Sequence, residues 1–161
     1  MDVERLTSLG RVSAVAPSPD GTWLAVAVQR LDSDRAKYVC DLHKVVLGVD
    51  APPVQLTHGQ WNDREPCFRR DGSLGFLSDR PADAGGSDDS KERSQVFVLP
   101  AAGGEPKPVT DEPLSVQAFR FAAGADRLVV QAAGLPGVPD DGKRSTYGDR
   151  REEGPSVLRY K

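Results

Sequence analysis

An internal repeat constrains the fold of this chain more than any other feature of its sequence. Residues 18–28, SPDGTWLAVAV, return as residues 69–78, RRDGSLGFLS, and a degraded third copy follows at residues 122–130. In the first two copies an Asp-Gly pair, Asp20-Gly21 and Asp71-Gly72, precedes an apolar run. Both residue types tolerate positive φ, so the chain can reverse tightly and enter a strand. Each copy therefore predicts the first hairpin of a repeated unit.

A second marker repeats with nearly the same period. Residues 54–57, VQLT, are answered by residues 107–110, KPVT. The aspartates are 51 residues apart (71 − 20) and the threonines are 53 apart (110 − 57). A period near ~50 residues, built from short strands with Gly and Pro turns, is typical of β-propeller blades. A β-sandwich with chance similarity between hairpins is the alternative, although a sandwich need not repeat at all.

The predicted strands form an all-β partial propeller, with about two complete four-stranded blades and part of a third. We expect strands at 11–16, 23–29, 38–47 and 54–57, then at 67–68, 74–78, 95–99 and 107–110, and finally at 116–121, 128–133 and 156–160. Gly103-Gly104 predicts a further tight turn before the strand at 107–110. The nearly continuous apolar content of residues 23–29 predicts a strand covered on both faces. The incomplete propeller is expected over residues 1–133, with blades at about 11–57, 62–110 and 116–161.

Residues 134–155 are expected to be a mobile insertion. This stretch is polar and rich in Gly and Pro, so it cannot bury enough apolar area to offset its ordering entropy. The third blade is unfinished where the sequence ends. Closed propellers use about 4–8 blades, so we expect a longer protein, or assembly with other chains through open blade edges.

The charge balance argues against two classes of partner. With 21 basic and 24 acidic residues the net charge is −3, which gives no basic stripe for nucleic acid and no polybasic surface for membranes. No signal sequence and no apolar run of ~20 residues is present, which predicts a cytoplasmic location. Cys40 and Cys67 are predicted to be buried reduced thiols, with a disulfide or a shared metal as the alternative.

The sequence offers no catalytic motif. A Gly-x-Ser-x-Gly nucleophile elbow is absent, and the stretch around Ser156 lacks the final glycine. His43, in a predicted strand, and His58, in a turn, have no nucleophile in a recognisable arrangement. The acidic 81–94 loop lacks the ligand order of a calcium loop, and no phosphate-binding glycine motif occurs. We therefore predict no catalytic residue, no cofactor and no metal.

One cluster is a candidate for substrate binding. Trp61, Arg64 and Glu65 place an aromatic ring beside both charge signs near the start of the second blade. They could line the mouth of a tunnel. The alternative is that they serve packing and an ion pair between blades.

Several motifs together resemble a known family. These are SPDG before LAV, QLT at 55–57, WNDREP at 61–66, FLSDR at 76–80, and LP before a Gly-Gly turn and Val-Thr. In this combination the chain resembles the N-terminal propeller of the prolyl oligopeptidase family, in its acylaminoacyl-peptidase and dipeptidyl-peptidase-like branch. The similarity covers about residues 12–130. TolB-like propellers share the SPDG and Leu-Thr markers.

The resemblance implies a noncatalytic role. In that family the propeller gates and orients peptide substrates for an α/β-hydrolase domain that holds a Ser-Asp-His triad and follows the propeller. No triad position exists in this chain, so it is expected to be inactive alone, and no residue is assigned to the family's amine-binding acidic pair. Two alternatives stay open, namely a TolB-like protein-interaction module and a truncated product without activity of its own.

Overall fold

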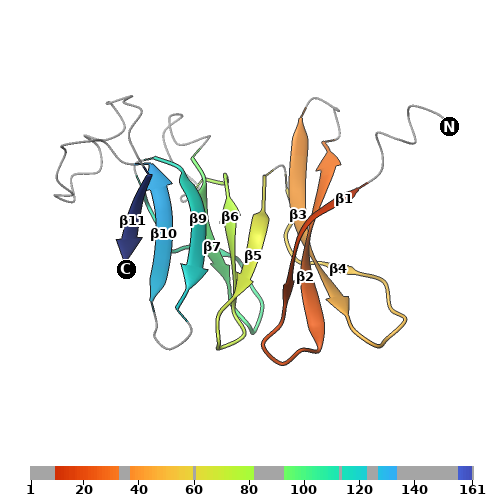
Figure 1. The fold of residues 1–161 in the computed structure, drawn as a ribbon. Helices are drawn as coiled ribbons and strands as arrows, with labels where there is room; N and C mark the ends of the chain where they lie inside the picture. The colour runs from red at the N-terminus through yellow and green to blue at the C-terminus, as the bar shows by residue number, and fades with distance from the viewer. Residues whose placement is uncertain are drawn as a thin grey trace.

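The computed structural model describes residues 10–32, 37–59, 61–81, 93–112, 114–122 and 127–133, together with the backbone of Ser156–Tyr160. These residues form strands joined by turns and loops, so the fold is all-β (Figure 1). None of the described segments forms a helix long and apolar enough to cross a membrane. The 134–155 insertion, most of the 81–94 loop and the turn of the third repeat lie outside the described residues.

Three antiparallel sheets follow one another along the chain (Figure 1). The first sheet contains β1 (Arg11–Pro17), β2 (Trp23–Leu31), β3 (Tyr38–Val46) and β4 (Val54–Gln55), in that order. The second contains β5 (Arg64–Phe68), β6 (Leu74–Ser78), β7 (Gln95–Leu99) and β8 (Lys107–Pro108). The third contains β9 (Val116–Phe121), β10 (Leu128–Ala133) and β11 (Ser156–Tyr160). In every sheet each strand pairs with the next one along the sequence.

Most predicted strands are confirmed, and the differences occur at strand ends. The strand predicted at 67–68 begins at Arg64, because Arg64 pairs with Leu77 of β6 on the far side of a bulge. The outer strands predicted at 54–57 and 107–110 are only two residues long. The predicted Gly103-Gly104 turn joins β7 to β8, with the Gly103 amide donating to the Pro100 carbonyl at 2.9 Å.

The repeated Asp-Gly pairs make matching turns. An oxygen of Asp20 accepts the amide of Thr22 at 3.0 Å, and an oxygen of Asp71 accepts the amide two residues on at 2.9 Å. The following glycines, Gly21 and Gly72, have φ of 69° and 84°. A side chain with a Cβ rarely adopts this conformation. The first sequence marker therefore encodes the hairpin that opens each of the first two sheets.

The threonine marker also has one structural role in both copies. The hydroxyl oxygen of Thr57 accepts the Leu42 amide at 3.0 Å, and that of Thr110 accepts the Val96 amide at 2.8 Å. Both threonines are buried. Each one satisfies a backbone donor on the third strand of its sheet, where the short fourth strand cannot. A buried amide left without a partner would cost free energy.

Two apolar clusters hold the three sheets together, one at each junction. The cluster between the first and second sheets contains Ala25, Ala27, Cys40, Leu42, Leu74, Phe76, Phe97 and Leu99. The cluster between the second and third contains Leu77, Val96, Val116, Phe119, Leu128 and Val130. Strand β6 contributes to both clusters and is buried along its whole length.

The prediction that residues 23–29 are covered on both faces needs correction. Ala25 and Ala27 of β2 are fully buried against the second sheet, whereas on the opposite face only Val26 is buried and Leu24 and Val28 are partly buried. Val12, opposite Val28 on β1, is 64% exposed. The described residues place a sheet on one side of β2 only. Cover on both faces is instead a property of β6, in the middle sheet.

Candidate functional site

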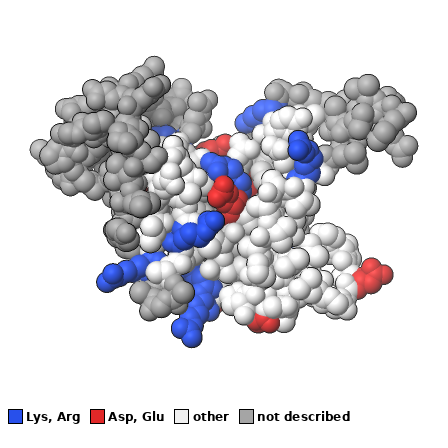
Figure 2. Space-filling model, viewed as in Figure 1, with Lys and Arg blue, Asp and Glu red and all other residues white. Residues whose placement is uncertain are grey.

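A cleft of about 570 Å³ lies beside the first strands of the first two sheets. It is lined by consecutive residues of β1 and β5, and by Arg120 of β9. In Figure 2 basic and acidic side chains gather in the middle of the face shown, over the region of β5 in Figure 1. The lining comprises Ser13, Ala14, Val15, Ala16, Pro17, Gln29, Cys40, Asn62, Arg64, Glu65, Pro66, Cys67, Phe68 and Arg120.

Two of the three predicted site residues lie together in this cleft. Nη1 of Arg64 is 3.8 Å from Oε1 of Glu65, and Nη2 of Arg64 donates to the hydroxyl of Ser94 at 3.2 Å. Both charged side chains remain about two-fifths exposed, at 37% and 42%. The ion pair therefore lies within β5 and does not join one sheet to the next.

The backbone is irregular at these two charged residues. In a regular strand, successive residues point to opposite faces of the sheet. Here the pairing of β5 with β6 shifts between Arg64 and Cys67, and Glu65 has a φ of 54°, in the left-handed region. A bulge of this kind re-aims a side chain. The bulge therefore occurs at the two charged residues of β5 that line the cleft.

Trp61, the third predicted residue, does not line the cleft. Its backbone carbonyl accepts the Cys40 amide at 3.1 Å, and its indole lies against Gly59, where an added Cβ would be 2.8 Å from the ring. Asp63 donates its amide to the Cys40 carbonyl at 2.9 Å. The segment before β5 is thus tied to β3, and the Trp61 ring packs against Gly59.

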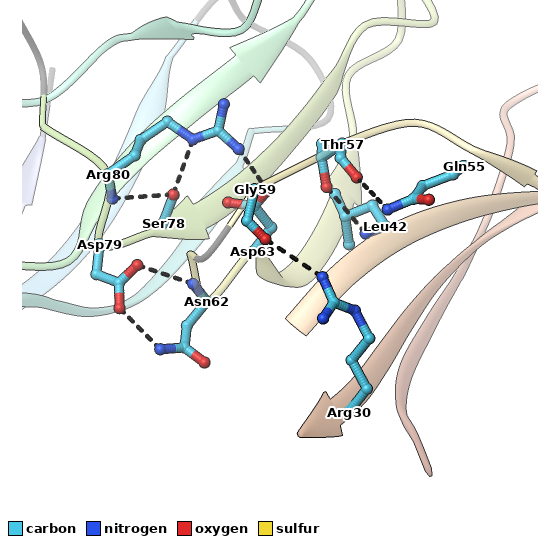
Figure 3. A network of polar contacts seen from close by, with 10 residues as sticks. All are labelled: Arg30, Leu42, Gln55, Thr57, Gly59, Asn62, Asp63, Ser78, Asp79 and Arg80. Atoms are coloured by element: carbon cyan, nitrogen blue, oxygen red, sulfur yellow. Dashed lines mark hydrogen bonds and ion pairs between the residues drawn. The ribbon is translucent and has the colours of Figure 1, made fainter. Parts of the chain in front are cut away.

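A buried ion pair that the sequence did not predict lies next to this segment (Figure 3). A carboxylate oxygen of Asp63, only 1% exposed, accepts a hydrogen bond from Nη2 of Arg80. Burial raises the pKa of Asp63, while the Ser78 hydroxyl and the Arg80 guanidinium lower it. Arg80 also donates through Nε to Ser78 at 3.0 Å. This arrangement fixes the end of β6 against the start of β5.

A second contact joins the same two segments. The backbone amide and the side-chain amide of Asn62 each donate to one carboxylate oxygen of Asp79, both at 2.8 Å (Figure 3). The WNDREP and FLSDR motifs therefore bind each other through Asn62–Asp79 and Asp63–Arg80. The charges of Asp63, Asp79 and Arg80 therefore serve the fold, and the sequence signal that could have revealed this is the joint occurrence of the two motifs.

The cysteines and histidines offer no catalytic arrangement in the described part of the chain. Cys40 is buried and Cys67 half-buried, and neither forms a disulfide, as predicted. Burial raises the pKa of the Cys40 thiol. His43 lies on β3 as predicted, with its Nδ1 unbonded to any described group, while His58 is exposed after Thr57. The described residues contain no group of three or more His, Cys, Asp or Glu side chains that could hold a metal ion.

Comparison with known proteins gives two similarities. The chain is 25% identical over 150 residues, or 91% of its length, to the uncharacterized peptidase YuxL of Bacillus subtilis (strain 168), of which it covers 21%. Its structure matches the apo form of the AtxE2 isopeptidase with a TM-score of 0.57 and 14% identity, covering 94% of this chain and 28% of that one. No family model matches the sequence.

These similarities relate the chain to only part of each of the two proteins. It spans about a fifth of the curated relative that it matches, and its all-β fold recurs in part of an isopeptidase. At 14% identity the structural match concerns the fold alone. The chain is therefore related in sequence, weakly, to a peptidase and shares the fold of a segment of another.

Proposed function

We propose that this chain is a noncatalytic part of a serine peptidase of the prolyl oligopeptidase type. In this proposal the three sheets are consecutive β-propeller blades, which gate and orient peptide substrates for an α/β-hydrolase domain in the same polypeptide. The observation that carries the proposal is the similarity of 91% of the chain to part of a peptidase. Three sheets with the same strand order, packed face to face, support it.

The position of the cleft agrees with an orienting role. In a propeller the blades surround a central channel. Here β1 and β5 are the first strands of their sheets and lie at the sheet edges, and both line the cleft, together with Arg120 of β9. Sheet edges carry backbone groups that an extended peptide can bind. We therefore assign the substrate path to the side of the sheets where their first strands lie.

The chemistry is assigned to residues outside this chain. Ser156, which follows Gly154 with the spacing of an elbow motif, lies in β11, whereas a nucleophile elbow is a sharp turn between a strand and a helix. His43 and His58 lie in a strand and an exposed loop of the first sheet. A propeller segment with this content orients a peptide and leaves bond cleavage to the triad of the hydrolase domain.

The test is to read the coding sequence on both sides of these residues and to compare two proteins. The 161-residue chain should not hydrolyse chromogenic acyl-amino-acid or peptide anilides. The longer product should contain a Gly-x-Ser-x-Gly elbow, should hydrolyse them, and should lose activity when the elbow serine becomes alanine. Turnover by the short chain that disappears with Ser156→Ala would contradict the proposal, as would a coding sequence without an elbow.

A further inference from the structure

We propose that Arg64 and Arg120 form a binding site for a carboxylate of a peptide in the cleft beside β1 and β5. The peptide part of this inference rests on the proposed function, and the carboxylate part rests on the charges and donors of the cleft. A guanidinium presents five N–H donors in a planar fork that matches a carboxylate, often in a bidentate manner. Both arginines line the same cleft from different sheets.

The contacts within the protein leave N–H groups of both arginines available to a ligand. Nη1 of Arg120 donates to the Phe119 carbonyl at 2.7 Å, which occupies one of its five N–H groups. Arg64 donates to Ser94, and its distance of 3.8 Å to Glu65 is longer than a hydrogen bond. Glu65 therefore offsets the charge of Arg64 only in part. The lining carries two cations and one anion, so the cleft attracts a negative group.

The remaining walls suit a peptide chain. Apart from its charged residues the lining is largely apolar, and the neutral polar side chains in it are Ser13, Gln29 and Asn62. Because the lining follows two sheet edges, an extended backbone can approach unpaired backbone groups there. A free inorganic anion would use the arginines alone. A peptide with a carboxylate would use the arginines, the apolar wall and the edges together.

The backbone of Glu65 points to function at the same place. A non-glycine residue in the left-handed region is uncommon, and such strain gathers at ligand sites when the surrounding structure enforces it. Here φ is 54°, and the strained residue lies next to Arg64 in the lining of the cleft. The irregular backbone thus coincides with the cation that we assign to the site and with the acid that moderates its affinity.

The carboxylate could be the C-terminus of a peptide or an acidic side chain, and the experiment separates the two. Three acetylated alanine tetrapeptides are titrated into the 161-residue chain by calorimetry at low ionic strength, up to millimolar concentration. One has a free C-terminal carboxylate, one is amidated, and one is amidated with a glutamate at its second position. We expect the amidated alanine peptide to bind at least about tenfold more weakly than whichever peptide carries the recognised carboxylate.

Variants test the assignment to named residues. Arg64→Gln and Arg120→Gln should each weaken binding of the recognised carboxylate by about tenfold, whereas Glu65→Gln should tighten it by up to about fivefold. Arg70→Gln is the matched control, because Arg70 is exposed in the second turn and does not line the cleft. Arg70→Gln should bind like the unchanged chain. All four variants are first compared by circular dichroism and thermal unfolding.

Three results would overturn the inference. They are equal binding of the amidated and carboxylate peptides, unchanged affinity in both cleft arginine variants with the fold intact, and no binding of any peptide at millimolar concentration. A failure of this inference can be told apart from a failure of the proposed function, because the binding measurements need neither a hydrolase domain nor turnover. A chain that binds the carboxylate while its longer product lacks an elbow would keep the site and discard the peptidase.

Discussion

Removal of the Arg80 charge should be among the most damaging single changes in this fold. In Arg80→Met the side chain keeps most of its apolar length, but Asp63, 1% exposed, loses its cationic partner. Breaking a buried pair by removing one partner costs about 3–5 kcal/mol. Arg80 is itself 14% exposed, so we expect a value near the lower end, about 3 kcal/mol.

The measurement is the free energy of unfolding from urea titrations followed by circular dichroism. Arg70→Met serves as the control, because its exposed side chain should change stability by less than about 0.5 kcal/mol. Since a domain of this kind has only about 5–15 kcal/mol of stability, Arg80→Lys is measured in parallel. It retains the charge but not the planar fork, and should recover part of the loss.

The pH dependence of the stability loss in Arg80→Met shows whether the lost charge is its cause. Burial holds the pKa of Asp63 above its ordinary value against the effects of Ser78 and Arg80, so protonating Asp63 favours the folded state. That contribution is full below the unfolded-state pKa, about 3.9, and is lost as the pH rises through the folded-state pKa. Without Arg80 the folded-state pKa rises further, so the loss in Arg80→Met should be larger near pH ~7 than near pH ~5.

Two results would refute this reasoning. A loss of the same size at both pH values would show that the damage comes from the packing of Arg80 over Phe76 and Phe97, whose ring centroids lie 5.5 Å from the guanidinium. A double variant, Asp63→Asn with Arg80→Met, that is no more stable than Arg80→Met would lead to the same conclusion. If the charge is the cause, the neutral amide should restore more than half of the lost free energy.

The remaining predictions concern packing, a buried amide and a turn. Gly75→Ala should lower the free energy of unfolding by about 1–3 kcal/mol, because an added Cβ would lie 2.5 Å from the Phe121 ring. The double variant Gly75→Ala with Phe121→Leu should recover part of this loss, as measured by thermal unfolding. Thr57→Val should lower the free energy of unfolding by about 1–3 kcal/mol, because it leaves the buried Leu42 amide without a hydrogen-bond partner. Thr57→Ser keeps the hydroxyl and should lower it much less. Urea titrations of the two variants measure the difference. The pKa of Asp71 should lie below its ordinary value, because Ser73 donates hydrogen bonds to its carboxylate. The stability that the ionised Asp71 contributes is therefore lost as the pH falls through this lowered pKa. An NMR titration of Asp71 in the unchanged chain and in Ser73→Ala checks this.

Much of the fold could be predicted from the sequence because its signals are local. The two Asp-Gly turns, the positions of β6, β7, β9 and β10, and the period shared with Thr57 and Thr110 follow from conformational preferences of a few adjacent residues. The candidate site was predicted in part. Arg64 and Glu65 line a cleft, whereas Trp61, singled out with them, packs against Gly59.

The tertiary structure alone decided which charges meet and where the cleft lies. Asp63 pairs with Arg80, 17 residues away, and not with its neighbour Arg64. Arg120, in the third sheet, reaches the same cleft as residues of the first. No local pattern encodes these encounters, because they depend on how whole sheets pack through the apolar clusters between them. The backbone preferences of a few adjacent residues determine each strand and turn. The partner of a buried charge depends instead on the tertiary packing, because an ionised group removed from water needs an opposite charge or hydrogen bonds from whatever group packs beside it.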